Sequence, residues 1–132
     1  MKSAALKVLL VAFAAAALAG CTTVQPIHNV KGSPVETPGG KPASMADVEK
    51  AILRAGAALG WKMQPVRPGL IAATLNLRTH TAVVDVAYNP RTYDITYKDS
   101  VDLNYDGTNI HRNFNGWVQN LDKGIRAQLL NL

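Results

Sequence analysis

Hydrophobic residues follow three different patterns along the chain. An unbroken apolar run extends from Val8 to Ala19. Apolar residues then recur every three or four positions between Val48 and Leu59, at every second position between Trp61 and Tyr97, and again every three or four positions between Ile110 and Leu129. The longer period is typical of amphipathic helices and the shorter one of half-buried strands. The pattern predicts a helix, several strands and a second helix behind an N-terminal apolar segment.

The boundaries of the first helix are marked by specific residues. Ser44 and Asp47 have the spacing of a capping box at its start, and Gly60 is placed to end it in a left-handed conformation. The expected buried face consists of Val48, Ala51, Ile52, Ala55 and Leu59. In the second helix the corresponding stripe is Ile110, Phe114, Trp117, Val118, Leu121, Ile125 and Leu129.

The region between the helices predicts an antiparallel sheet. Trp61 and Met63 begin a short strand that Pro65 restricts to a sheet edge. A turn around Thr79 and His80 would join the next two strands, and Pro90 suits the turn that follows. The pairs expected across the first turn are Leu77 with Ala82, Leu75 with Val84, Ala73 with Val86 and Ile71 with Tyr88; those across the second are Tyr88 with Tyr93, Val86 with Ile95 and Val84 with Tyr97.

These elements predict an α+β fold with two layers. An antiparallel sheet of three to four strands would carry both helices on one face, in the order α-β-β-β-(β)-α, with Trp61 and Trp117 in the seam. The optional last strand is an irregular or edge-strand stretch with Leu103 and Tyr105. The opposite face of the sheet would be polar and open to solvent.

The N-terminal segment has the features of an export signal. Lys2 and Lys7 precede the apolar run, which is too short for a membrane-spanning helix of about 20 residues. The run ends in Leu18-Ala19-Gly20-Cys21, which resembles the lipobox of bacterial lipoproteins. That resemblance implies cleavage before Cys21, attachment of diacylglycerol to its sulfur, and acylation of the new amino terminus.

The sequence therefore divides into three parts. Residues 1–20 are predicted to be a signal peptide, and residues 44–132 a globular α+β domain. Residues 21–43, rich in Pro and Gly, are expected to be a flexible tether behind the lipidated cysteine. A tether of that length has a typical span of roughly 25 Å, which would let the domain move away from the bilayer surface.

Charge and cysteine content exclude several functions. The chain has 14 basic and 9 acidic residues, a net charge of +5 that falls to +3 once Lys2 and Lys7 are removed. No basic run suggests a nucleic-acid partner, and a single cysteine allows neither an internal disulfide nor a zinc site of the usual kind. No cofactor is expected.

Three segments of the predicted domain form a recognisable signature: Tyr93 to Ser100, Leu103 to Tyr105 and Ile110 to Val118. With these segments the domain, over most of its length, resembles a family of small uncharacterised lipoproteins of Gram-negative bacteria. The resemblance implies export and a fold but no catalytic residue. Thr22 follows Cys21 where an Asp would act as an inner-membrane retention signal, so family behaviour implies the outer membrane, periplasmic face, over the inner membrane.

One segment has the spacing of a metal site. Asp102, Asn104, Asp106 and Gly107 match the first half of a calcium-binding loop, but Asn113 stands where the bidentate glutamate should be. A turn rich in Asp and Asn before a helix is the favoured interpretation, with weak calcium binding as the alternative.

Catalytic residues are not expected. Asp99, Ser100 and His111 could be imagined as a relay, but a helix-capping role for His111 is preferred, and His80 is expected in a solvated turn. Tyr88, Tyr93 and Tyr97 are expected in the core rather than on a ligand platform.

The sequence thus predicts a membrane-anchored, non-catalytic envelope module. It would contact membrane lipid through Cys21 and bind an envelope protein or a cell-wall component. The alternative is a small envelope enzyme or a weak calcium-dependent binding module.

Overall fold

The first helix forms as its end signals predict. The computed structural model describes residues 23–132, and in it α1 runs over Met45–Ala58. The Ser44 hydroxyl accepts from the backbone N–H of Asp47 at 3.1 Å, and the Asp47 carboxylate accepts from the N–H of Ser44 at 3.3 Å. Gly60, at φ +88°, ends the helix. Of the predicted buried face only Leu59 is exposed, because it is the C-cap and lies beyond the last full turn.

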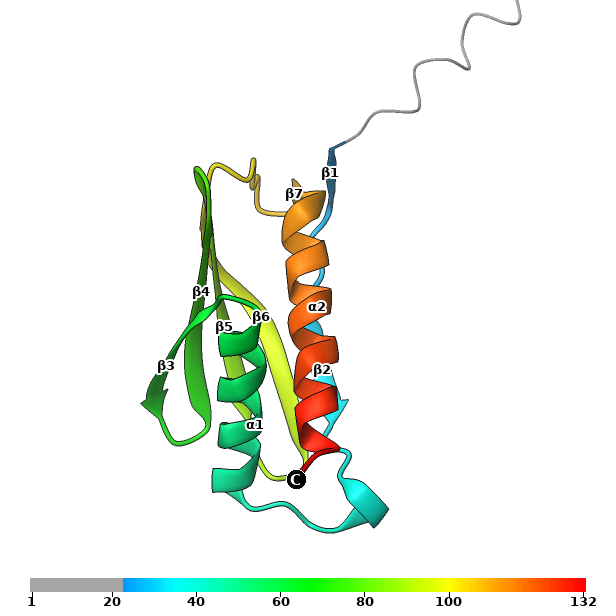
Figure 1. Cartoon of the computed structure of the whole chain (residues 1–132). Coiled ribbons are helices and arrows are strands. Elements are labelled where there is room, and N and C mark those ends of the chain that lie inside the picture. Colours follow the sequence, from blue (N-terminus) through cyan, green and yellow to red (C-terminus); the bar gives the residue numbers. More distant parts are fainter. Residues whose placement is uncertain (1–22) are drawn as a thin grey trace, which may run out of the picture.

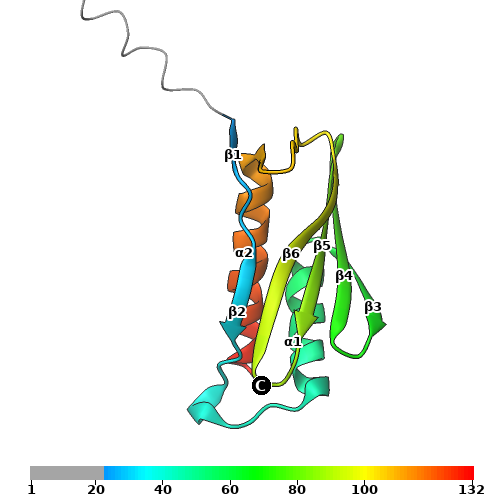
Figure 2. The same ribbon diagram turned by 180° about the vertical axis from the view of Figure 1, so that it is seen from behind.

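Five antiparallel strands form one sheet, which carries both helices on the same face (Figures 1 and 2). Its strands, in spatial order, are β2 (Val30–Pro34), β6 (Thr92–Val101), β5 (His80–Tyr88), β4 (Leu70–Leu77) and β3 (Lys62–Arg67). The second helix, α2, spans Arg112–Leu129. The predicted α+β class is confirmed. The strand count of three to four is too low, because β2 adds a strand that the sequence did not suggest.

The predicted flexible tether is wrong for residues 24–34. β1 (Val24–Pro26) pairs with β7 (Asn109–His111) in a separate two-stranded sheet, and β2 pairs with β6. Gly32, at φ +60°, lies where the register of β2 shifts, and Pro34 is the last residue of this edge strand. Glycine and proline are both tolerated at a bulge and at an edge, so their presence did not prevent a strand. A short 3₁₀ turn over Pro38–Gly40 then leads to α1.

The β4–β5 hairpin has a tighter turn than predicted. Leu77 pairs with His80, and Leu75 with Ala82, so only Arg78 and Thr79 form the turn. Arg78 adopts φ +55°, which a two-residue hairpin turn requires but which its side chain does not signal. The register differs from the prediction by two residues, so every side chain keeps its predicted face. The β5–β6 register, including Tyr88 opposite Tyr93, is confirmed.

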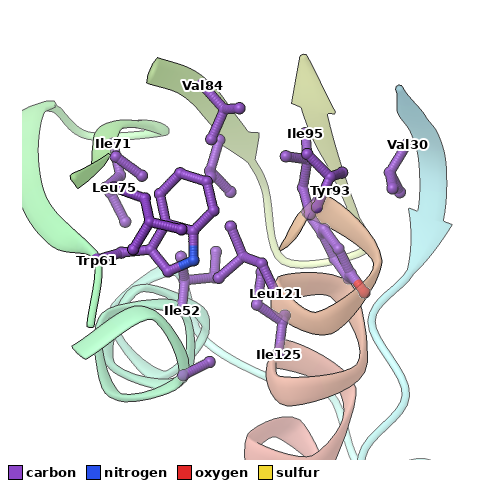
Figure 3. Packing of buried hydrophobic residues seen from close by; sticks show 14 of the residues in the cluster. Val30, Ile52, Trp61, Ile71, Leu75, Val84, Tyr93, Ile95, Leu121 and Ile125 are labelled. Atoms are coloured by element: carbon purple, nitrogen blue, oxygen red, sulfur yellow. The ribbon is translucent and has the colours of Figure 1, made fainter. Parts of the chain in front are cut away.

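The core fills the space between the two helices and the sheet (Figure 3). Trp61 is buried between α1 and the sheet, and Val30 of β2 extends the core past Ile95. On α2, Phe114 is fully buried, whereas Trp117 is only half-buried. Phe114 is thus the core residue that was predicted, and Trp117 packs against the core at its border, with its ring 6.4 Å from that of His80.

Neither helix in residues 23–132 is long and apolar enough to cross a membrane. The predicted signal peptide and Cys21 lie outside the described residues.

Candidate functional site

The structure gathers most of the residues singled out in the sequence at one end of the molecule. The turn between β4 and β5, the loop after β6, the β1–β7 pair and the start of α2 all lie there (Figure 1). The C-terminus and the turn between β5 and β6 lie at the other end. We call these the β1 end and the C-terminal end.

The candidate calcium residues form a turn at the β1 end. One Asp106 carboxylate oxygen accepts from the backbone N–H groups of Thr108 at 2.9 Å and Asn109 at 2.7 Å. These hydrogen bonds from Asn109 and Thr108 lower the pKa of the Asp106 carboxyl. Asp102 and Asn104 take left-handed backbone conformations, with φ of +60° and +53°. This is the Asx-rich turn that the sequence favoured.

Asp102 forms its hydrogen bonds with the β4–β5 turn rather than with the Asp106 turn. Its carboxylate accepts from the Thr79 hydroxyl at 2.8 Å, and its backbone carbonyl lies 2.7 Å from Nδ1 of His80. These contacts fasten the loop to the β4–β5 turn. Within residues 23–132, no three His, Cys, Asp or Glu side chains gather in a way that could hold a metal ion.

The residues of the imagined relay have separate partners. The Ser100 hydroxyl lies 2.8 Å from the Tyr97 hydroxyl, and Asp99 accepts from the backbone N–H of Ser100 at 2.8 Å. Nδ1 of His111 accepts from the N–H of Asn113 at 3.1 Å, so His111 caps α2 as preferred. In the described part of the chain, no hydrogen bond joins Ser100 to His111.

A cluster of rings at the β1 end was not anticipated from the sequence. His80 stands at the first position of β5, half-buried, with its ring 6.2 Å from that of His111 and 6.4 Å from that of Trp117. It is therefore packed rather than free in a solvated turn. The cluster borders a shallow groove of about 310 Å³, lined by Leu77, Arg78, His80, Asn113 and Trp117. Leu77, Arg78 and His80 come from the β4–β5 turn and Asn113 and Trp117 from α2, so the groove forms only where the helix lies beside this turn.

The N-terminal segment is fastened to α2 at the same end. The Thr23 carbonyl accepts from the N–H of Arg112 at 2.7 Å. Asn115, buried on α2, accepts from the N–H of His28 at 2.8 Å and donates to the carbonyl of Pro26 at 2.9 Å. Sequence reasoning missed this contact, and its only available signal was an amide side chain directly after Phe114, at the border of the apolar stripe. The position of the chain is thereby fixed two residues after Cys21.

The C-terminal end carries a larger, open groove. Its volume is about 830 Å³, and its lining includes Val35, Lys41, Arg91 and Leu130. The Val35 N–H donates to the carbonyl of Arg91 at 2.8 Å, which holds the segment before α1 against the β5–β6 turn. The groove offers two cations, the carboxylate of Glu36 and apolar walls.

The helix-free face of the sheet is polar, as predicted. Asp85 and Lys98 lie 3.6 Å apart on it, and Thr74, Asp94 and Thr96 are half-buried among their neighbours. The tyrosines face the other way: Tyr88 and Tyr93 are buried in the core, while Tyr97 is half-buried against it. Burial and a hydrogen bond to Asp122 of α2 raise the pKa of Tyr93, so its hydroxyl serves to join β6 to α2.

Comparisons with protein-family models, with curated proteins and with solved structures found no match to this chain.

Proposed function

We propose that this protein is a lipoprotein of the outer membrane, anchored through acylated Cys21 and facing the periplasm. The observation that carries the proposal is the sequence Leu18-Ala19-Gly20-Cys21 behind a leader with two lysines and an apolar run. Two or three acyl chains at one residue give a far more stable membrane attachment than the marginal one of a single chain.

The folded part acts as a non-catalytic interaction module. Its candidate catalytic side chains have structural partners: Ser100 contacts Tyr97, and His111 caps α2. The sheet meanwhile presents a polar face that neither helix covers (Figure 2). A polar surface of mixed charge fits an envelope protein or a cell-wall component, because polar groups that stay hydrated in the free protein can pair across an interface.

Metabolic labelling with a palmitate analogue tests the anchor. Wild-type protein should incorporate the label and remain with membranes after a high-salt wash, while Cys21→Ser should do neither. Thr22→Ser, one position along, is the matched control and should behave as wild type. An unlabelled wild type, or a Cys21→Ser variant that stays in the membrane fraction, would contradict the proposal.

Photo-crosslinking in cells tests the interaction surface. A crosslinking residue at Thr96, on the open face of the sheet, should give a discrete adduct, and one at exposed Lys123 on α2 should not. Adducts from Lys123 alone would place the partner on the helical face and overturn the assignment of the sheet.

A further inference from the structure

We propose that the β1 end of the domain rests directly on the bilayer that holds the acyl chains. This inference rests on the proposed function, because it takes the lipid attachment at Cys21 as its starting point. It reverses the expectation of a domain on a long tether, since the residues expected to form the tether are largely part of the fold.

The distance between anchor and fold is very short. Only Thr22 separates Cys21 from Thr23, so the Cα atoms of Cys21 and Thr23 are at most about 7.6 Å apart in any conformation. The carbonyl of Thr23 accepts a hydrogen bond from the N–H of Arg112 at the start of α2, and Val24 pairs with His111. The membrane surface must therefore pass close to the β1 end.

The same end carries exposed apolar side chains on several elements. Leu77 at the hairpin tip is 44% exposed, Val101 at the end of β6 is 56% exposed, and Tyr105 in the following loop is 39% exposed. Val24 of β1 is 37% exposed, next to the point where the chain leaves toward Cys21. The half-buried Trp117 lines the groove behind Leu77. Aromatic side chains with a polar edge are typical of the membrane interface.

Charge at this end is close to balanced. Arg78 and Arg112 are exposed, as are Asp99, Asp102 and Asp106. The contact should therefore depend on apolar burial and on the short linkage, with no requirement for anionic lipid. The C-terminal end would then point into the periplasm, because α2, about 27 Å long at 1.5 Å per residue, runs from one end of the molecule to the other (Figure 1).

Lipid-attached quenchers can locate the two ends relative to the bilayer. Cys21 is the only cysteine, so in the mature acylated protein a Leu77→Cys or Val101→Cys variant has one free thiol for a small fluorophore. Leu130→Cys, at the C-terminal end and 53% exposed, is the matched control. Each labelled protein is reconstituted into phosphatidylcholine vesicles with a nitroxide on the headgroup, with and without phosphatidylglycerol.

We expect quenching at positions 77 and 101 to be at least twofold stronger than at 130, in both lipid mixtures. Equal quenching at all three positions, or none at 77 and 101 in vesicles that carry the protein, would overturn the inference and leave the anchor intact. Quenching only with phosphatidylglycerol would overturn the apolar contact. A protein whose N-terminus proves unmodified by mass spectrometry and fails to float with vesicles would overturn the proposed function, and this inference with it.

Discussion

Asn115 is a buried amide whose hydrogen bonds all go to the N-terminal segment. Its oxygen accepts from the N–H of His28, and its nitrogen donates to the carbonyl of Pro26 and, at 3.5 Å, to the side chain of Gln25. The backbone at Pro26 and His28 has no strand partner for these groups, so without Asn115 they would lie unpaired against α2. One side chain thus positions the stretch of chain between β1 and β2.

Replacing Asn115 with Ala should lower the free energy of unfolding of residues 23–132 by about 1–3 kcal/mol, the cost of leaving partly buried polar groups without partners. Denaturant unfolding measures this, and hydrogen exchange at the His28 amide should accelerate in parallel. Asn120→Ala, exposed on the same helix, should change stability by less than about 0.5 kcal/mol. Equal stabilities for the two variants would show that Asn115 does not hold the segment.

At the scale of elements, the loop after β6 is a turn built from carboxylate-to-backbone hydrogen bonds. The Asp106 oxygen that accepts from Thr108 and Asn109 needs no negative charge for that geometry. Asp106→Asn preserves an acceptor at this place, whereas Asp106→Ala removes it. The two variants separate a turn from a calcium site, because calcium ligation in such loops depends on the charge.

We therefore expect the melting temperature of residues 23–132 to be the same within about 2 °C in chelator and in ~1 mM calcium. Even a site with a millimolar Kd would be only half-occupied at that concentration and would stabilise the fold only slightly. Asp106→Ala should melt lower than wild type in both conditions, and Asp106→Asn, which keeps the acceptor but loses the charge, should melt between the two near neutral pH. Because folding lowers the pKa of the Asp106 carboxyl, its charged form stabilises the fold at pH values above its ordinary pKa of about 3.8, and this contribution is lost as the pH falls below that. A calcium-dependent rise of several degrees, absent from Asp106→Asn, would establish a metal site.

Periodicity predicted the elements that have a long buried face and missed those that do not. Phe114, Leu121 and Ile125 repeat on one face of α2, and such a repeat can be read without any tertiary information. β2 has only Val30 and Ser33 turned inward, on either side of a bulge, so no period of two survives. The turn at Arg78 could not be predicted either, because the pairing of β4 with β5 imposes its left-handed backbone conformation.

The candidate sites were less predictable than the elements for a related reason. Asp106 bonds to Thr108 and Asn109 of its own loop, but the partners of Asp102 are decided by where the β4–β5 turn lies. The groove of His80, Asn113 and Trp117 depends on the same turn, together with the start of α2 that lies beside it. Spacing along one loop can show which side chains are present but not which distant residues reach them.

At the scale of the whole molecule, the folding unit begins near Thr23 rather than at Ser44. β2 satisfies the outer edge of β6 and brings Val30, 8% exposed, against Ile95. Without β2, β6 would become an open edge strand, and such edges are prone to pair with other chains. In a chain that lacks both strands the β1–β7 pair would be lost as well, together with the backbone hydrogen bonds between Thr23 and Arg112 and between Ile27 and Thr108.

The chain that starts at residue 44 should therefore be much less stable than the chain that starts at residue 23. If the lost edge and the uncovered core cost about 2 kcal/mol or more, the melting temperature should fall by about 10 °C or more. Circular dichroism melts and size-exclusion chromatography of 23–132 and 44–132 make the comparison, and the shorter chain should also self-associate. Residues 35–132, which lack β1 and β2 but keep the contact of Val35 with Arg91, should resemble 44–132. If instead 44–132 were monomeric and had the same melting temperature as 23–132, the strands before α1 would contribute nothing to the stability of the fold. The domain would then be free to move on the long tether that the proline and glycine content of residues 21–43 first suggested.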